Sequence, residues 1–496
     1  MTKSQKQLFS VYGIGVLIAM LIFFLRAHPL IVFDTDDWLY IFYARLPFPL
    51  WGDWNPTRIF PEVFMSLCSQ VAVWLVYPIW GDYIGALSLV HGVVLSLFVT
   101  IYVLTFTLFT QKRLHATFAS SVISGILFLL MHFWVFRCSD SSNSFLFAAD
   151  DTTCVFYYTI PALLNLTLIF LFESFPHLTD LHTPSHLWEK GILLALVYFA
   201  VFSNLFSSYI LAIWAGVDWL CTGYLLYSSR KKNTTKDPAL VSRFVYELAI
   251  VLAWLLSVVY EINGGRADSL EKPPFFDSLC DAVSRVKDRI LSCNPVFSGF
   301  AVVSVLLFLI EIFIAFARKK ANPSVTFFFP KGIFILSLCV IYLILSGSKA
   351  GLGYICRPEV QLGVFSVAFV VLCGIVIYFI NAYPRLLAPI SLALILVCFQ
   401  INTPGVTFDD TSYSGKEWQA CYTYSRYVFD ELTRAEQEHL TEYELHVPVY
   451  ESWDNFPLAP YGCRRFCNAL LCHGIIPRRM TVTLIPDPEI NARFGL

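Results

Sequence analysis

Long apolar runs recur along the whole 496-residue chain. A transmembrane helix needs about 20 mostly apolar residues to cross about 30 Å of hydrocarbon, and these runs approach that length. Because the runs are continuous rather than alternating, a transmembrane β-barrel is excluded. The chain is therefore predicted to be an all-α polytopic membrane protein, with spans at 9–25, 84–109, 117–136, 155–172, 188–203, 206–228, 244–260, 298–316, 331–347, 358–380 and 386–401.

The composition narrows the function classes. Hydrophobic residues make up 57% of the chain and charged residues 14%, against roughly 25% charged in soluble domains. A net charge of −2 gives no electrostatic reason to expect nucleic acid as a partner. The sequence has neither a Walker-type glycine loop nor a dinucleotide-binding fingerprint after a predicted strand. An ATP-driven pump built on this chain alone is therefore not expected.

The apolar stretch 61–80 decides the topology. Cytoplasmic loops of membrane proteins are enriched in Lys and Arg. If 61–80 does not cross, the basic clusters share the cytoplasmic side. We therefore expect 61–80 to be a surface helix in the first outer loop, which its flanking Pro56, Pro61 and Pro78 also favour. This threading places the N-terminus and the basic residues 112–113, 230–232, 236, 318–320, 331 and 385 inside.

The only sizeable soluble piece follows the last span. We divide the chain into a transmembrane domain, 1–401, and an extracytoplasmic C-terminal region, 402–496. This region has a helical pattern over 415–440 and strand-like runs at 445–450 and 480–485, which predict a small α/β unit. The protein is thus expected to be a multi-pass cell-membrane protein whose functional site and C-terminus face outward.

The first outer loop carries a cluster of carboxylates, Asp34, Asp36 and Asp37, followed by Trp38 and Arg58. A carboxylate can take the proton from an acceptor hydroxyl during group transfer. Neighbouring carboxylates raise each other's pKa or share a divalent cation such as Mg²⁺ or Mn²⁺. We identify the three aspartates as candidate catalytic residues, with Trp38 and Arg58 as substrate contacts. The structural alternative is a hydrated turn that caps the surface helix.

Two later outer segments add candidate substrate contacts. Asp151, Tyr157 and Tyr158 lie at the start of the fourth span, and Lys349 and Arg357 precede the tenth. An arginine can hold a phosphate at two points, and a second cation nearby would assist. The alternatives are an interfacial aromatic belt for the tyrosines and snorkelling to the membrane surface for the cations.

The chain contains fourteen cysteines, nine of them outside in this threading. Two pairs, Cys138 with Cys154 and Cys280 with Cys293, each bracket one loop, so local disulfides are plausible in an oxidising compartment. The cysteines near the C-terminus have no standard zinc spacing. No metal site with protein ligands alone is predicted.

These features together resemble the GT-C superfamily of integral-membrane glycosyltransferases, in particular the bacterial polysaccharide- and O-antigen-modifying type. The resemblance rests on the motif 34–38, the stretch 54–58, the Tyr-Tyr-Thr-Ile-Pro sequence at 157–161, Arg357 and the closing segment 485–496. It implies an inverting transfer of sugar from a polyprenyl-phosphate donor to a cell-surface glycan or lipid-linked acceptor. It also implies that Asp36 and Asp37, and less directly Asp34, supply the base or hold a metal. The cysteine-rich C-terminal region and the long 261–297 loop depart from that pattern.

Two other functions share these substrates. A transporter or flippase of a lipid-linked sugar would place ionisable residues within its spans, near the middle of the membrane. An O-antigen polymerase or ligase would centre on a large late outer loop. The concentration of acidic residues in the first outer loop favours surface chemistry over both.

Overall fold

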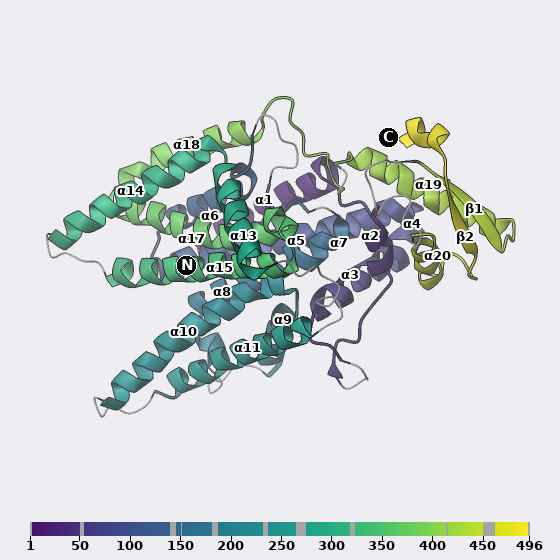
Figure 1. Ribbon diagram of the computed structural model, residues 1–496. Coiled ribbons are helices and arrows are strands. Elements are labelled where there is room, and N and C mark those ends of the chain that lie inside the picture. The colour runs from purple at the N-terminus through teal and green to yellow at the C-terminus, as the bar shows by residue number, and fades with distance from the viewer. Residues whose placement is uncertain are drawn as a thin grey trace.

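A computed structural model of the chain describes residues 2–49, 54–138, 145–149, 151–180, 187–231, 237–263, 274–317, 323–412, 415–449 and 462–494. Within these ranges the protein is mostly helical, with one small sheet near the C-terminus (Figure 1). Ten helical segments are long and apolar enough to cross a membrane, and Phe118–Trp134 is a shorter apolar helix. A polytopic helical membrane protein is therefore confirmed, while the number of crossings and their orientation stay predictions.

Each predicted span coincides with a helix. The first is α1 (Lys3–Ile22), which continues through a π-helical turn, η1 (Phe23–Ala27), and the fourth combines α7 (Thr152–Cys154), the π-helical turn η4 (Val155–Thr159) and α8 (Ile160–Ser174). The others are α5 (Tyr83–Arg113), α6 (Phe118–Trp134), α9 (Leu187–Val201), α10 (Leu205–Lys231), α11 (Pro238–Ile262), α14 (Pro295–Ala317), α15 (Pro323–Ala350), α17 (Pro358–Ala382) and α18 (Leu387–Ile401).

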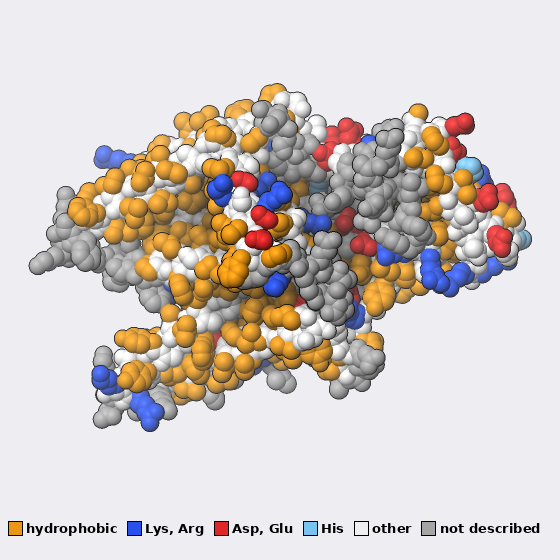
Figure 2. All heavy atoms as spheres, in the orientation of Figure 1, with side chains coloured by type: hydrophobic (Ala, Val, Ile, Leu, Met, Phe, Trp, Pro, Cys, Tyr) orange, Lys and Arg blue, Asp and Glu red, His pale blue; other side chains and the backbone are white. Residues whose placement is uncertain are grey.

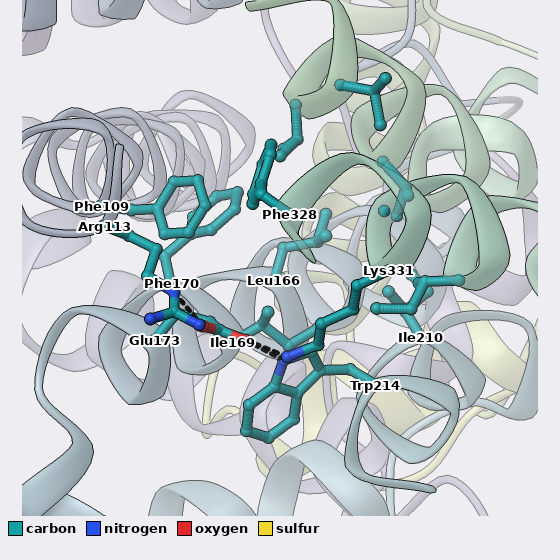
Figure 3. Close-up of a pocket in the computed structure, with 15 residues that line it drawn as sticks. Phe109, Arg113, Leu166, Ile169, Phe170, Glu173, Ile210, Trp214, Phe328 and Lys331 are labelled. Atoms are coloured by element: carbon teal, nitrogen blue, oxygen red, sulfur yellow. Dashed lines mark hydrogen bonds and ion pairs between the residues drawn. The ribbon is translucent and has the colours of Figure 1, made fainter. Parts of the chain in front are cut away.

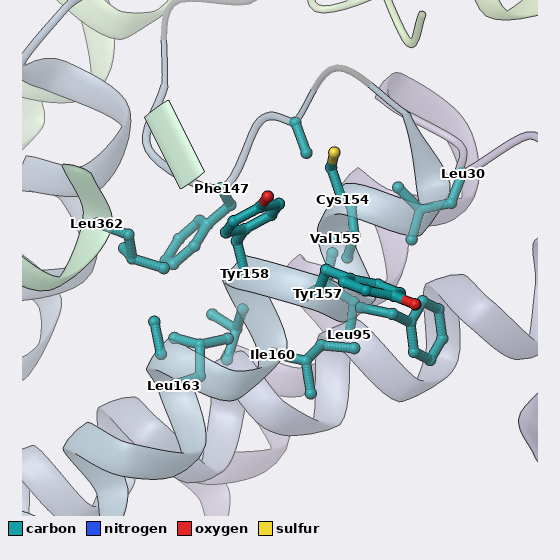
Figure 4. Packing of buried hydrophobic residues seen from close by; sticks show 14 of the residues in the cluster. Leu30, Leu95, Phe147, Cys154, Val155, Tyr157, Tyr158, Ile160, Leu163 and Leu362 are labelled. Carbon is teal, nitrogen blue, oxygen red and sulfur yellow. The ribbon is translucent and has the colours of Figure 1, made fainter. Parts of the chain in front are cut away.

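Aromatic side chains fill the centre of the helix bundle. The rings of Phe106 and Phe128 stack at 3.8 Å between α5 and α6, and Tyr157, Tyr158 and Leu163 pack into the same core from the fourth span (Figure 4). Many helices keep an exposed apolar face, as on α14 and α18 (Figure 2). Because lipid is as apolar as these side chains, such faces suit contact with a bilayer.

The C-terminal region packs on one end of the bundle, which we call the capped end (Figure 1). The region consists of α19 (Trp418–Gln437), β1 (Glu442–Val447), α20 (Gly462–Cys472) and β2 (Thr481–Pro486). The two strands are parallel, with Glu442 opposite Thr481, and α20 lies on the crossover that a parallel pair requires. The small α/β unit is thus present, with β1 starting three residues before the predicted run.

Several contacts fix the C-terminal region to the bundle. His473 bonds through Nδ1 to the hydroxyl of Tyr83 at 2.7 Å, and the hydroxyl of Ser425 donates to the carbonyl of Val32 at 2.6 Å. Arg137 donates to three carbonyls in the segment that leaves α18, including that of Ile401 at 2.8 Å. The capped end is therefore a packed interface between the two regions.

The stretch predicted as a surface helix runs without a break from Ile59 to Trp80, as α3 (Ile59–Val71), the π-helical turn η3 (Ala72–Val76) and α4 (Tyr77–Trp80). Its first N–H groups donate to the carbonyls of Phe202 and Ser203, between α9 and α10. Its other end turns at Gly81, where φ is +74°, directly into α5. The helix is long and apolar enough to cross a membrane, yet both of its ends contact segments at the capped end.

The region 261–297, expected as a long loop, contains the amphipathic helix α13 (Phe275–Leu291). It packs on α15 and runs across the direction of the neighbouring spans (Figure 1). Phe276, Val283 and Ile290 recur at every seventh position and are exposed, so one apolar stripe runs along the helix. Shorter helical elements are α2 (Thr35–Tyr40), α16 (Gly353–Cys356), η5 (Pro176–Thr179), η6 (Pro384–Leu386) and η7 (Pro488–Phe494).

Candidate active site

The acidic cluster folds into a reciprocal helix cap at the start of α2. A carboxylate oxygen of Asp34 accepts the N–H of Asp36 at 2.9 Å. In return, Oδ2 of Asp37 accepts the N–H groups of Phe33 and Asp34, at 3.0 and 3.2 Å. Such a capping box satisfies N–H groups that have no partner within the helix. The acidic motif therefore caps a helix, as the structural alternative expected, although that helix is α2 rather than the surface helix. Capping accounts for part of the cluster.

Asp37 also ties α2 to the fourth span. Its second oxygen, Oδ1, accepts both the N–H and the hydroxyl of Thr153 in α7, each at 2.7 Å. The side chain is fully buried, and burial raises the pKa of Asp37 to about 6 although these bonds oppose the shift. A carboxylate that already accepts four hydrogen bonds has little capacity for a substrate proton. This geometry favours a positioning role for Asp37.

Asp36 and Asp34 are the other two carboxylates of the cluster. The side chain of Asp36 is 54% exposed and forms an ion pair with Arg465 of α20, Oδ1 to Nη1, at 2.6 Å. Asp34 is 5% exposed; burial, reinforced by the charge of Asp37, raises the pKa of Asp34 to about 7. A carboxyl with that pKa exchanges protons near neutral pH, but Asp34 is closed to solvent. The exposed Asp36 is therefore the carboxylate of this cluster that an acceptor hydroxyl can reach.

Trp38 does not occupy a binding position. Its side chain is fully buried and packs against the rings of Tyr83 and Phe466, at centroid distances of 6.5 and 5.0 Å. It therefore serves the interface between α2 and the C-terminal region, rather than an open substrate contact as the sequence suggested.

Arg357 lies on the other side of α7 from Asp37. Its Nη1 contacts Sγ of Cys154 at 3.7 Å and Oε1 of Glu359 at 3.8 Å, and its guanidinium lies over the ring of Tyr354 at 4.8 Å. Thr153 and Cys154 are consecutive, so α7 bridges the acidic cluster and Arg357. Three segments far apart in sequence thus meet at α7.

Four other predicted substrate contacts, Asp151, Tyr157, Tyr158 and Lys349, do not lie together. Asp151 caps α7 through the N–H of Cys154, so it orders the bridge. Tyr157 packs on Tyr40 of α2, with ring centroids 4.9 Å apart, while Tyr158 packs on Phe206 at 6.4 Å. Lys349 is exposed near the end of α15, with the short helix α16 between it and Arg357.

A second polar cluster borders α2 at the start of α3. Arg45 pairs with the buried Glu62, Nε to Oε2, at 2.6 Å, and Arg58 approaches Glu261 at 4.0 Å. Burial raises the pKa of Tyr40, and the charge of Glu62 adds to the shift while Arg58 opposes it. Arg58 was predicted from the sequence as a substrate contact. The Arg45–Glu62 pair was not, because no residue spacing indicates that these two side chains meet.

Arg58 has an unusual backbone conformation. Its φ and ψ of 56° and 27° lie in the left-handed region, which costs on the order of 1–3 kcal/mol for a residue other than glycine. The donation of its N–H to Ser203 at 3.1 Å holds that conformation. Strain of this kind concentrates at functional sites, so Arg58 stays a candidate substrate contact.

The described residues give no support to a metal-dependent mechanism. No group of three or more His, Cys, Asp or Glu side chains among them is arranged to hold a metal ion, and four donors already occupy Asp37. Because the carboxylates present do not make a ligand set, no step is assigned to Mg²⁺ or Mn²⁺. The expected disulfides are also not formed among the described cysteines; Cys154 contacts Arg357 instead.

A charge network between helices lies at the opposite end of the bundle and was missed by the sequence analysis. Nζ of Lys331 contacts Glu173 and Asp218, each at 2.6 Å, and Arg243 pairs with Asp218 and Glu247. These residues come from α8, α10, α11 and α15. The sequence alone does not reveal this network, because the pairing depends on which helices are neighbours.

Comparisons with protein families, curated proteins and solved structures find no match to this chain. The resemblance to the GT-C superfamily therefore rests on the sequence motifs alone.

Proposed function

We propose that this protein is a membrane glycosyltransferase that moves a sugar from a polyprenyl-phosphate donor to a glycan or lipid-linked acceptor at the capped end. The observation that carries the proposal is that α7 contacts the acidic segment through Thr153 and Asp37 and contacts Arg357 through Cys154, beside a helical membrane domain. A carboxylate and an arginine at one membrane-facing site suit a hydroxyl acceptor and a phosphate leaving group.

The proposed reaction is a single displacement with inversion. The acceptor oxygen attacks the anomeric carbon while the bond from that carbon to the donor phosphate oxygen breaks. Asp36, the most exposed carboxylate, takes the hydroxyl proton, and Asp34 lies directly beside it. Polyprenyl phosphate leaves with the electron pair of the broken bond, and Arg357 stabilises the negative charge that grows on its oxygen.

The proposed topology has eleven spans, with the capped end extracytoplasmic. The distribution of basic residues supports this orientation. Contacts of both ends of Ile59–Trp80 with the capped end support a surface position for this helix, next to the site.

A transporter of a lipid-linked sugar is the second candidate. The network of Lys331, Glu173 and Asp218 supports it, because charged residues within spans often mark transport pathways. These charges are mutually paired and lie at one end of the bundle rather than along a route through it, so the transferase ranks first.

The test uses the purified full chain in vesicles with a synthetic polyprenyl-phosphate sugar. Transfer to a hydroxyl acceptor is measured for wild type and Asp36→Asn, and movement of a labelled donor between leaflets is followed in parallel. We expect transfer by the wild type and a loss of about 10²–10⁴-fold in Asp36→Asn, with unchanged thermal stability. Leaflet exchange without transfer would instead select the transporter.

A further inference from the structure

A cavity lies between helices at the end of the bundle opposite the capped end (Figure 3). Its volume is about 70 Å³, roughly that of two water molecules in the liquid. Five helices line it, namely α5, α8, α10, α15 and α17, and nearly all of the lining side chains are apolar. They are Phe109, Leu166, Ile169, Phe170, Ile210, Trp214, Phe328, Ile335, Val367, Val370 and Val371, with Gly332 and the charged Arg113, Glu173 and Lys331.

The charged residues gather at one end of this cavity. Arg113 is the last residue of α5, and Phe109 lies one turn earlier. Glu173 is likewise next to the end of α8, whereas Leu166 lies about two turns deeper in the bundle. The cavity therefore runs from a charged rim near the helix ends towards an apolar interior, as a membrane lipid does from headgroup to chain.

Arg113 has the chemistry to hold an anion at the rim. Its Nε contacts Glu173 Oε2 at 3.2 Å, and its side chain is 44% exposed. Among the described residues this is its one ion pair, and it leaves both terminal nitrogens of the guanidinium for another acceptor. Lys331, in contrast, is 10% exposed and is held between Glu173 and Asp218. An exposed planar guanidinium can hold a phosphate at two points.

We propose that this cavity binds one anionic phospholipid from the leaflet at this end of the bundle. Methylene groups of one acyl chain close to the headgroup enter the apolar interior between α8, α10 and α17, and the phosphate contacts Arg113. The ion pairs of the rim balance, since three cations, Arg113, Lys331 and Arg243, face three anions, Glu173, Asp218 and Glu247. An anionic headgroup is favoured over a zwitterionic one because it has no ammonium group of its own to compete with Arg113 for its phosphate. This site is separate from the proposed transferase site and does not depend on it.

The test is native mass spectrometry of the detergent-purified full chain, titrated with phosphatidylglycerol or with phosphatidylcholine of identical acyl chains. We expect one tightly retained phosphatidylglycerol, and at least fivefold less phosphatidylcholine. Arg113→Gln should lower phosphatidylglycerol retention at least fivefold, while Lys112→Gln, the adjacent cation outside the lining, should leave it unchanged. Val370→Trp, which fills the cavity, should also lower retention, and Val364→Trp on the same helix should not.

Each outcome decides the proposal. Equal retention of the two lipids, or wild-type retention in Arg113→Gln or in Val370→Trp, overturns it. Equal losses of phosphatidylglycerol retention in Arg113→Gln and Lys112→Gln would also overturn it, because the lipid would then be attracted to basic residues in general. The thermal unfolding midpoint of each variant, measured without added lipid, shows whether that variant is folded. If Val370→Trp is unstable, Arg113→Gln still decides the test because it changes an exposed position.

Discussion

Asp37 and Thr153 are joined by two hydrogen bonds of 2.7 Å, from the N–H and from the hydroxyl of Thr153 to a single carboxylate oxygen. The contact connects the segment after the first span to the segment before the fourth. Arg357 contacts the residue that follows Thr153. Together with the bond from the Thr152 hydroxyl to the carbonyl of Ile31 at 2.9 Å, this buried carboxylate therefore positions the acidic cluster relative to Arg357.

Replacing Asp37 by asparagine should destabilise the protein as well as impair transfer. The amide keeps one acceptor oxygen and turns an NH₂ group towards N–H donors, so at least two bonds to a charged group are lost. Each contributes about 1.5–3 kcal/mol. We expect a clearly lower thermal unfolding midpoint, whereas Asp36→Asn, at an exposed position, should keep the wild-type midpoint. Equal midpoints in all three proteins would contradict a positioning role for Asp37.

Asp34 should make stability depend on pH. Its pKa is raised to about 7 in the folded protein, from an ordinary value of 3.8, so the folded state keeps a proton that the unfolded state has released. Stability is then lost as pH rises from about 4 to about 7, by up to roughly 4 kcal/mol at 1.4 kcal/mol per pKa unit. The free energy of unfolding, measured across this pH range, should fall more steeply for wild type than for Asp34→Asn. Parallel curves would mean that Asp34 is ionised throughout.

Arg357→Lys should slow transfer although it keeps the charge. An ammonium loses the planar two-point contact with phosphate, so the defect should appear in the transfer step, where charge grows on the leaving oxygen. The rates of wild type, Arg357→Lys and Arg357→Ala with a synthetic donor measure this. A loss only in Arg357→Ala would make charge rather than geometry the requirement, and full activity in both would remove Arg357 from the site.

Arg465 should matter for activity more than for stability. Its ion pair with Asp36 is partly exposed, and such pairs contribute about 0–1 kcal/mol. Arg465→Gln should therefore keep the wild-type unfolding midpoint within a few degrees while changing the transfer rate severalfold. Arg464→Gln, the exposed neighbouring arginine, is the control and should behave as wild type. Identical rates in both variants would leave the C-terminal region without a part in the site.

The topology can be tested with reporter fusions. A reporter after residue 115 should be cytoplasmic and one after residue 410 external, if Ile59–Trp80 lies on the surface. An external signal at 115 would instead make that helix a span and invert the helices that follow it.

The helices were predictable because each apolar run carries its own signal of length and hydropathy. The amphipathic α13 was missed although Leu279, Val283 and Val286 follow the spacing of three or four residues that indicates a helix. The prediction relied on long apolar runs, and charges such as Asp281 and Lys287 interrupt this one. The parallel pairing of β1 and β2 was also beyond prediction, because a strand run does not specify its partner.

The sequence indicated which segments carry candidate site residues, but not the roles within the acidic cluster. Asp34, Asp36 and Asp37 have the same side chain, and only their surroundings separate an exposed ion pair from a fully bonded, buried carboxylate. The pairing of Lys331 with Glu173 and Asp218 was likewise out of reach, because it depends on the packing of three helices.

The π-helical turn Val155–Thr159 joins α7 to α8, and a π-helical turn contains one residue more than the α-helix needs. If one of these residues were deleted, the backbone could return to regular α-helix with Thr153 still close to Asp37, because the wider turn spreads its extra residue over nearly the same rotation and rise. A deletion in the regular helix α8 has no such reserve. Each residue there sets about 100° of rotation, so its loss would turn Thr153 away from Asp37 although no contact residue had changed. A one-residue deletion inside the π-helical turn should therefore be tolerated better than one in α8.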